Sequence, residues 1–438
     1  MINKINKYID EKEDEIAFLI SELIKIDSQN SGIPNSANES EVQHYVKDLM
    51  KKVGLSVNEY AFDKEKVRPN VLGFYKGTGG GKSLLINAHA DTISITSPEK
   101  WKYPPLGGII ENGRVYGRGA SDDKMAIVAM IFALKAILEN GINLKGNVML
   151  LSSVGEESGE GATIGAGSVM KMIDKPDFAL VSESTCMEID ITSSSLTYFE
   201  IYIKGKPAHN MGRNQILFPQ SYSIPTGNEV AVDALSKALL VIDSLYRLER
   251  DLCLNNKFEV WGAGGTPTQD ERGVGLFTIN PAIISGGKSI ASIMEDVTIT
   301  YSVYYPNTMN IEELKNIINK QILSVAESDI WLRDNPPELK MPLHTVWPGF
   351  ATEKDHPGVK ALRVAYKKAL SKEPIITGNK SVMDTSFISA AGIPVVACGP
   401  GGVETNQHGI DEFCELHEVL KSIKVYASMM IEWCGVES

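Results

Sequence analysis

A histidine and an aspartate follow the short apolar run Leu84–Ala88, and they are the first residues whose types and spacing could do chemistry together. The run has the length of a buried strand, so His89 and Asp91 stand where that strand ends. Two positions apart on an extended chain, their side chains point to the same side. A carboxylate beside an imidazole is the pair that orients a metal-binding histidine. Because a single His-x-Asp pair is more often structural, its meaning depends on the rest of the chain.

More acids and a second histidine stand at the ends of other predicted elements: Asp122 and Asp123 at a helix start, Glu156 and Glu157 after a strand, Glu183 after another strand, and His408 in a glycine-rich loop. The carboxyl edge of an α/β sheet gathers such loops. Two imidazoles and three carboxylates can hold a pair of divalent metals, and mixed nitrogen and oxygen ligands favour zinc, with cobalt and manganese as alternatives. In the doublet Glu156–Glu157, one carboxylate could bind metal while the other deprotonates a water. Each acid pair alone is also typical of solvated charge at a helix start, so it is their recurrence after strands that favours a metal site.

The elements that would position these residues alternate between strands and helices, which indicates an α/β fold. Apolar residues form a helical stripe over 4–26, and buried strands are predicted over 83–88, 147–153 and 178–182. After about Ile189 the pattern changes to half-exposed strands and long helices, and the alternation returns from Pro357. We therefore expect a central mixed sheet flanked by helices, built from residues 1–189 and 342–438. An inserted α+β (ferredoxin-like) domain over residues 190–341 would interrupt it.

The composition limits the classes of partner. Lysine and arginine number 43 against 55 acids, a net charge of −12, which does not favour nucleic acid. The five cysteines are scattered and form no Cys-x-x-Cys, as is typical of reduced thiols. The N-terminal segment has no apolar leader, and no apolar run approaches the length of a membrane span. We expect a cytoplasmic protein with neither a nucleic-acid nor a membrane partner.

Taken together and in order, these motifs resemble those of the M20 metallopeptidases, a family that includes acetylornithine deacetylase, succinyl-diaminopimelate desuccinylase, aminoacylase and carboxypeptidase G2-like enzymes. The resemblance rests on His89-x-Asp91, Gly117–Lys124, Gly155–Gly159, Glu183 and His408, and it spans most of the chain. It implies hydrolysis of an amide bond in a small N-acyl-amino acid or dipeptide-like substrate. It also implies that residues 190–341 form a lid through which a homodimer assembles.

The resemblance further implies a role for each residue. It predicts two ligand sets that share one bridging aspartate: His89, Asp122 and Glu183 for one metal, and Asp122, Glu157 and His408 for the other. Glu156 takes the position of the general base, and Asp91 that of a carboxylate hydrogen-bonded to His89. The segment Lys204–His209 resembles the motif that supplies an oxyanion-stabilising histidine from the inserted domain, which makes His209 the candidate.

Two other functions stay open on the sequence. A two-zinc aminopeptidase shares the catalytic plan but usually lacks a large insertion, and a non-catalytic metal- or amino-acid-binding protein would not need Glu156. The arginine that commonly binds the substrate carboxylate in the family is missing from its usual place, and Arg213 and Arg272 are the candidates to replace it. The run Gly77–Ser83 does not fit a phosphate loop, because Lys76 stands where the first glycine should be and a strand follows.

Overall fold

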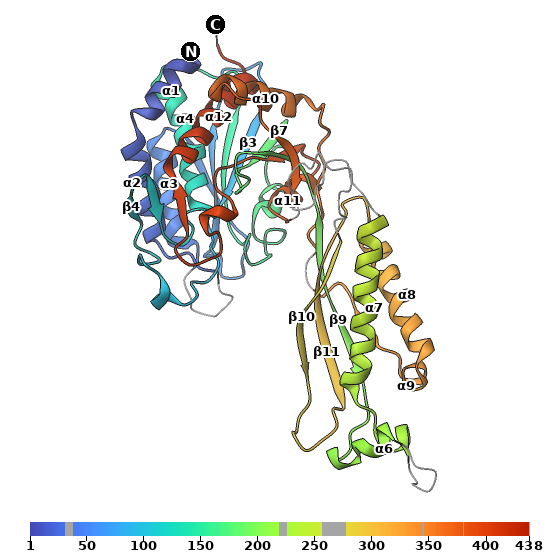
Figure 1. Cartoon of the computed structure of the whole chain (residues 1–438). Coiled ribbons are helices and arrows are strands. Elements are labelled where there is room, and N and C mark those ends of the chain that lie inside the picture. Colours follow the sequence, from blue (N-terminus) through green and yellow to red (C-terminus); the bar gives the residue numbers. More distant parts are fainter. Residues whose placement is uncertain (31–37, 219–225, 256–276, 344–345, 380, 438) are drawn as a thin grey trace. The chain divides into compact units, whose positions relative to one another are not determined.

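The computed structural model describes residues 1–30, 38–218, 226–255, 277–343, 346–379 and 381–437 (Figure 1). These residues form two compact units. The first unit contains residues 1–192, 350–378 and 383–438, and the second contains residues 193–349 and 379–382. The mixed α/β class predicted from the sequence is confirmed.

A mixed sheet, eight-stranded within the described residues, forms the centre of the first unit. The order is β1 (Ser56–Ala61), β2 (Pro69–Tyr75), β6 (Val148–Ser153), β3 (Leu84–His89), β7 (Phe178–Val181), β14 (Val395–Ala397), β8 (Ile189–Ser193) and β13 (Ile376–Asn379). Strands β6, β3, β7 and β14 run parallel to one another, so their carboxyl ends share one edge. The candidate residues of the sequence follow three of these ends.

Helices cover the sheet because its central strands are apolar on both faces. Figure 1 shows α4 and α12 on one side of the sheet and α11 on the other. Leu85 and Leu151 of the sheet share a core cluster with Val169 and Ile388 from two of the shorter helices. The helical elements of this unit are α1 (Ile2–Asp10), α2 (Glu13–Lys25), α3 (Ser40–Lys52), η1 (Pro98–Lys100), α4 (Lys124–Glu139), α5 (Ala166–Val169), α10 (Pro357–Leu370), α11 (Thr385–Ala390), η4 (Val403–Thr405) and α12 (Leu416–Cys434).

The helical stripe over residues 4–26 is divided between α1 and α2. Ile5 and Ile9 are the buried residues of α1, and the buried stripe of α2 starts at Ile16. Between them the chain reads Asp10–Glu15, six charged residues with no apolar side chain to bury. A helix gains most of its stability from its buried face, so it breaks where that face is interrupted.

A small antiparallel sheet ties the segment before α4 to the segment before α12. Its order is β15 (Phe413–Glu415), β5 (Arg114–Tyr116) and β4 (Ile109–Glu111). The pairing places residues 117–123 and 408–412 side by side, although about three hundred positions separate them.

The second unit has its own antiparallel sheet and its own core. The strand order is β10 (Thr278–Gly286), β11 (Asp296–Tyr305), β9 (Ser195–Lys204) and β12 (Glu338–Lys340). Helices α7 (Ala234–Asn255) and α8 (Ile311–Ser328) lie along one face of the sheet, where they cover the alternating apolar residues of β9 (Figure 1). The shorter elements are η2 (Asn210–Gly212), α6 (Arg213–Leu217), η3 (Gly227–Glu229) and α9 (Ile330–Asp334). Its role as a lid and dimerisation domain stays a prediction.

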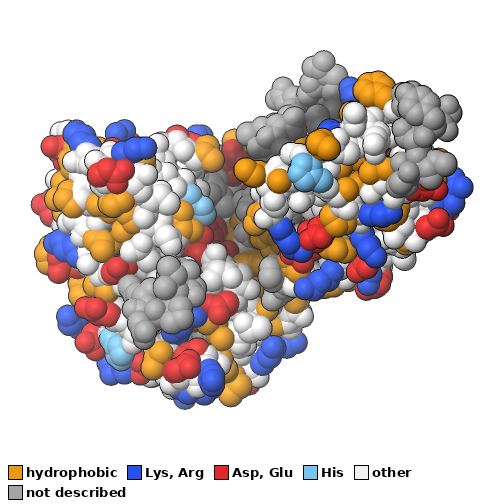
Figure 2. Space-filling view, turned by 90° about the horizontal axis from the view of Figure 1, so that it is seen from below, with side chains coloured by type: hydrophobic (Ala, Val, Ile, Leu, Met, Phe, Trp, Pro, Cys, Tyr) orange, Lys and Arg blue, Asp and Glu red, His pale blue; other side chains and the backbone are white. Residues whose placement is uncertain are grey.

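Two observations concern the surface. On the face shown in Figure 2, the described lysine and arginine side chains are interspersed with acids and do not gather into one continuous patch. None of the helices in the described ranges combines the length and the apolar character that a membrane crossing requires.

A buried lysine connects the first turn of α4 to the end of α2. The Lys124 ammonium is fully buried and donates to the carbonyl oxygens of Leu23 at 3.0 Å and Ile26 at 2.6 Å. These carbonyls belong to the last turn of α2, where a cation is favoured by the helix dipole. Burial nevertheless lowers the pKa of Lys124 to about 8, because the charged form loses its hydration.

We expect this ammonium to make the stability of the fold depend on pH. The unfolded chain keeps the proton up to about pH 10.4, whereas the folded chain releases it above about pH 8. The contribution of Lys124 to the free energy of unfolding therefore rises with pH across this window, by at most about 1.4 kcal/mol per pH unit, and is constant below it. Denaturant titrations at pH 8 and pH 10 should show a larger rise for wild type than for Lys124→Met. Equal rises in the two proteins would contradict the assignment.

Candidate metal centre

The candidate residues are brought to one edge of the large sheet by its parallel strands. His89 is the last residue of β3, Glu156 and Glu157 follow β6, and Glu183 follows β7. Asp122 comes from the turn before α4, and His408 from the loop before β15. Parallel strands end at a common edge, so these six residues, which are up to about three hundred positions apart in the sequence, become neighbours.

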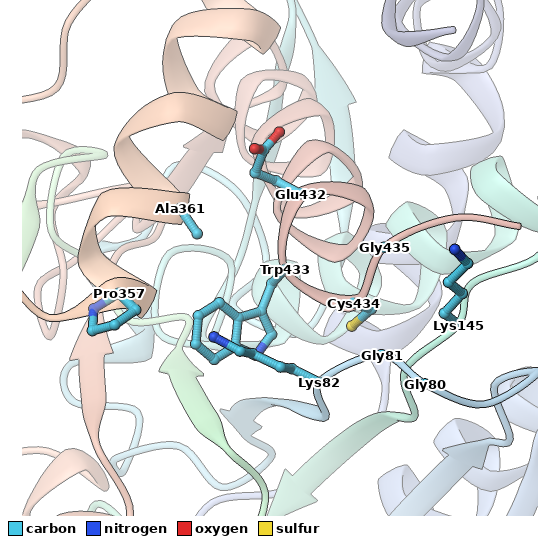
Figure 3. A pocket seen from close by; sticks show the side chains of 10 residues that line it. All are labelled: Gly80, Gly81, Lys82, Lys145, Pro357, Ala361, Glu432, Trp433, Cys434 and Gly435. Atoms are coloured by element: carbon cyan, nitrogen blue, oxygen red, sulfur yellow. The ribbon is translucent and has the colours of Figure 1, made fainter. Parts of the chain in front are cut away.

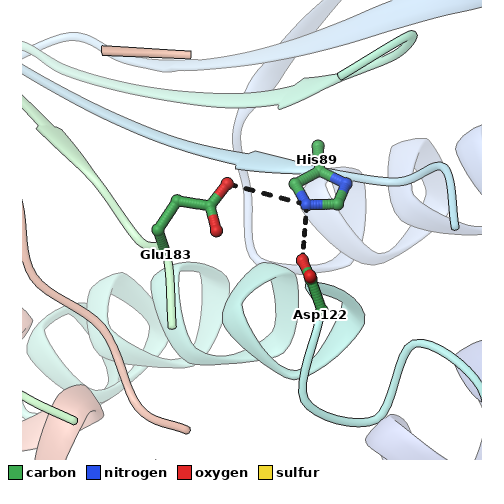
Figure 4. A group of neighbouring side chains, drawn as sticks. All are labelled: His89, Asp122 and Glu183. Carbon is green, nitrogen blue, oxygen red and sulfur yellow. Dashed lines mark hydrogen bonds and ion pairs between the residues drawn. The ribbon is translucent and has the colours of Figure 1, made fainter. Parts of the chain in front are cut away.

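The side chains form two groups around Asp122. The Nε2 atom of His89 lies 2.8 Å from Asp122 Oδ1 and 3.6 Å from Glu183 Oε1 (Figure 4). The Nε2 atom of His408 lies 3.0 Å from both Asp122 Oδ2 and Glu157 Oε1. The two oxygens of Asp122 therefore face different imidazoles. Within each group, one ligand atom per residue lies within 4.8 Å of the others.

The ring of His89 is held in the tautomer that leaves Nε2 free for a metal. Its Nδ1 lies 3.0 Å from the carbonyl oxygen of Asp91, which can only accept, so Nδ1 carries the hydrogen. The carboxylate of Asp91 is farther from Nδ1, at 3.5 Å. Its two oxygens instead accept the backbone amides of Glu156 at 3.2 Å and Glu157 at 3.0 Å. Asp91 thus orients the ring of His89 through its carbonyl oxygen and fixes the turn that carries Glu156 and Glu157 through its carboxylate.

The charges at this edge fit divalent cations. Burial, together with the charge of Asp122, raises the pKa of Glu183 to about 8 and also raises the pKa of Glu157. Burial and the charges of Glu183 and Glu157 raise the pKa of Glu156 well above its usual range. For Asp122 burial acts in the same direction, but the imidazoles of His408 and His89, which face its two oxygens and can be protonated when no metal is bound, hold its pKa below the usual range. Carboxylates that repel one another in a low dielectric need positive charge, and two divalent ions supply it. The donor set of imidazole nitrogen and carboxylate oxygen suits zinc, cobalt or manganese.

Sequence reasoning missed the role of several residues at this edge. Glu412 is fully buried, and its Oε1 accepts the backbone amides of Ser121 at 2.9 Å and Asp122 at 3.1 Å. Its Oε2 pairs with the buried Arg118 at 2.5 Å. The amide of Gln407 donates to Asp122 Oδ2 at 2.5 Å. The small sheet, which pairs residues 114–116 with 413–415, brings these groups together.

The remaining candidates belong to the second unit. His209 is exposed and begins η2, where its Nδ1 accepts the backbone amide of Met211 at 3.2 Å. Its role stays a prediction. Arg213 pairs with Asp233 at 2.7 Å, and Arg272 lies outside the described residues.

A separate cavity of about 390 Å³ lies at the amino-terminal edge of the same strands (Figure 3). It contains none of the candidate ligands. Lys82 lies over the Trp433 ring, with its Nζ 4.2 Å from the ring centroid, and Figure 3 shows Lys145 on the far side of the Gly80–Gly81 turn. The two lysines that line the cavity do not point toward a common position. We therefore take the cluster of candidate ligands, and not this cavity, as the candidate catalytic site.

Removing one ligand should remove one metal. After loading with zinc and desalting, we expect elemental analysis to find about one metal ion fewer per chain in Glu157→Ala than in wild type, because one ligand group loses a donor. His417→Ala is the matched control, because this exposed imidazole pairs with Glu415 and Glu418 and stands outside both groups. Full occupancy in Glu157→Ala would mean that Glu157 is not a ligand.

Comparison with known proteins agrees with this geometry. The model of peptidase family M20/M25/M40 matches residues 85–432. N-formyl-4-amino-5-aminomethyl-2-methylpyrimidine deformylase of Bacillus subtilis (strain 168) is 30% identical over 447 residues, covering 99% of this chain and 98% of that protein. Succinyl-diaminopimelate desuccinylase of Ehrlichia ruminantium (strain Gardel) is 25% identical, covering 90% of this chain and 93% of that protein.

The fold has counterparts among solved structures. Human carnosine dipeptidase 1 superposes with a TM-score of 0.72 at 16% identity, and the match covers 99% of this chain and 100% of that one. The family resemblance drawn from the sequence motifs is therefore confirmed. The chain belongs to peptidase family M20/M25/M40 and is a metallohydrolase that acts on C–N bonds.

Proposed function

We propose that this protein hydrolyses the amide bond of a small N-acylated amine and that Glu156 is the general base. The observation that carries the proposal is the position of Glu156. It shares a turn with the ligand candidate Glu157, and the carboxylate of Asp91, two residues after the ligand candidate His89, accepts the backbone amides of both glutamates. It is absent from both ligand groups of the described residues. A carboxylate beside a metal cluster but outside its ligand sets is free to move protons.

In this mechanism His89, Asp122 and Glu183 would hold one metal ion, and Asp122, Glu157 and His408 would hold the other. When bound, the two ions polarise the scissile carbonyl and acidify the attacking water. Glu156 accepts the proton that this water loses as its oxygen attacks the carbonyl carbon. The same carboxyl group then gives the proton to the amine nitrogen as the C–N bond breaks. The raised pKa of Glu156 suits both steps, because the protonated carboxyl must persist between them.

His209 is the proposed donor to the oxyanion. Since its Nδ1 accepts the amide hydrogen of Met211, the ring proton resides on Nε2. An Nε2–H group can donate to a negatively charged oxygen without first taking up a proton. We also propose that the protein forms a homodimer through the second unit. The chain that His209 serves, its own or its neighbour's, then depends on how the two chains assemble.

The relatives support a proposal for the substrate class. A deformylase and a desuccinylase both remove a small acyl group from an amine, and a dipeptidase cleaves a short amide-linked pair. These reactions share the cleavage of an amide bond between a small acyl group and an amine. We propose N-formyl and other short N-acyl amines first, and N-acyl-amino acids and dipeptides next. Zinc is the proposed metal, with cobalt and manganese as substitutes.

Glu156→Gln should separate the enzyme from a binding protein on the same fold. We expect the variant to keep its metal content while kcat for the best substrate of an N-acyl panel falls by about 10²–10⁴-fold, the usual contribution of general acid–base catalysis. Glu111→Gln, an exposed glutamate on β4, is the control and should keep wild-type activity. Metal binding by wild type without hydrolysis of any formamide, acyl-amino acid or dipeptide would favour the binding protein.

His209→Ala tests the oxyanion donor. Loss of one such donor costs about 10²–10³-fold in kcat, and we expect a decrease of this size with unchanged metal content. His209→Gln should recover part of the rate, because its amide can still donate. A wild-type rate in His209→Ala would place the donor elsewhere.

A further inference from the structure

We infer that Arg68 is a positioning residue for the proposed general base, because it clamps both ends of the turn that carries Glu156 and Glu157. The inference rests on the proposed function of Glu156. The turn spans residues 155–160, directly after β6. Arg68 stands one residue before β2, and no ligand group of the described residues includes it.

The first arm of the clamp runs through Glu39 to the start of the turn. Glu39 is fully buried, and Arg68 grips its carboxylate with two bonds, from Nε at 2.7 Å and from Nη2 at 2.6 Å. The same carboxylate accepts the backbone amide of Gly155 at 3.2 Å. A two-pronged arginine–carboxylate pair fixes orientation as well as distance. Arg68 thereby sets where the Gly155 amide is held.

The second arm reaches the end of the turn. The Nη1 atom of Arg68 lies 2.8 Å from Glu160 Oε2, which also accepts the Ser158 hydroxyl at 2.8 Å. The turn is closed by the Glu160 amide, which donates to the carbonyl oxygen of Gly155 at 2.8 Å. Gly155 itself has φ of +73°, and a Cβ there would lie 3.0 Å from the Cβ of Glu160. The turn is therefore too tight to tolerate much displacement of either end.

Between the two ends, Asp91 holds the middle of the turn through the amides of Glu156 and Glu157. Asp91 and Glu39 are near enough for their charges to repel. Arg68 supplies the opposite charge to Glu39 and so permits both carboxylates to stay close to the same turn. Without the guanidinium, Glu39 is a buried charge without its partner, and its hold on Gly155 is lost. The expected consequence is a displaced Glu156 carboxylate rather than a missing one.

The test is a kinetic comparison under saturating zinc. A displacement of about 1 Å at a catalytic group can cost about 10²-fold, so we expect Arg68→Met to lower kcat by about 10- to 100-fold while KM changes by less than about threefold. Arg68→Lys should recover part of kcat, because an ammonium can neutralise Glu39 but cannot grip both carboxylates. Arg363→Met is the control: Arg363 is an exposed arginine of α10 that pairs with Glu373 at 4.0 Å, outside both ligand groups, and its loss should leave kcat unchanged.

A purely structural role for Arg68 predicts a different result. In that case the melting temperature falls but kcat per metal-loaded chain equals that of wild type, and the inference is overturned. If Arg68→Met does not fold, Glu160→Gln removes only the second arm, and kcat should still fall measurably with KM retained; an unchanged kcat would equally overturn the inference. An inactive wild type would instead count against the proposed function, so the two failures are distinguishable.

Discussion

The first unit depends on one electrostatic constraint, which is the crowding of carboxylates at the carboxyl edge of β3, β6 and β7. Because these strands are parallel, the loops that follow them all lie at this edge. The acids lose hydration on burial and repel one another, which is why the pKa of Glu183 rises to about 8. Asp122 escapes this only because two imidazoles face it. The repulsion among these carboxylates lowers the stability of the fold when no cation is bound. Bound cations relieve this repulsion, so metal binding and stability are linked.

A second group of acids holds in place the loops that carry the candidate ligands and the candidate base. Asp91, Glu412 and Glu39 are all fully buried, and each accepts backbone amides from a loop that carries a candidate ligand or base. Two of the three have an arginine partner, Arg118 or Arg68. Charge-assisted bonds to amides are strong and directional. The acids of this edge are therefore divided between those that face the metals and those that fix the backbone behind them.

The sequence predicts the first group much better than the second. An apolar strand followed by an acid or a histidine is a local pattern, so His89, Glu157 and Glu183 stand out from their neighbours. Glu412 contacts Arg118 across 294 positions, and Glu39 reaches Gly155 across 116. Nothing near either glutamate in the sequence marks it, because its role is set by the pairing of β5 with β15 or by the packing of α3. Asp91 is an intermediate case: its spacing points to His89, while the amides that its carboxylate accepts come from 65 and 66 positions farther along.

Three positively charged side chains of the first unit are already paired with groups of the protein, and this affects which substrates the metal centre can bind. Arg118 is bound to Glu412, Arg68 to Glu39 and Glu160, and Lys124 to two carbonyl oxygens of α2. Each of these three positive charges stabilises the protein's own groups, and releasing one for a ligand would leave a buried partner unpaired. A carboxylate on the substrate would therefore need its counter-charge from the bound metals or from another part of the chain. An acyl amine without a carboxylate makes no such demand, and this is a physical argument for the proposed order, in which short N-acyl amines come ahead of N-acyl-amino acids.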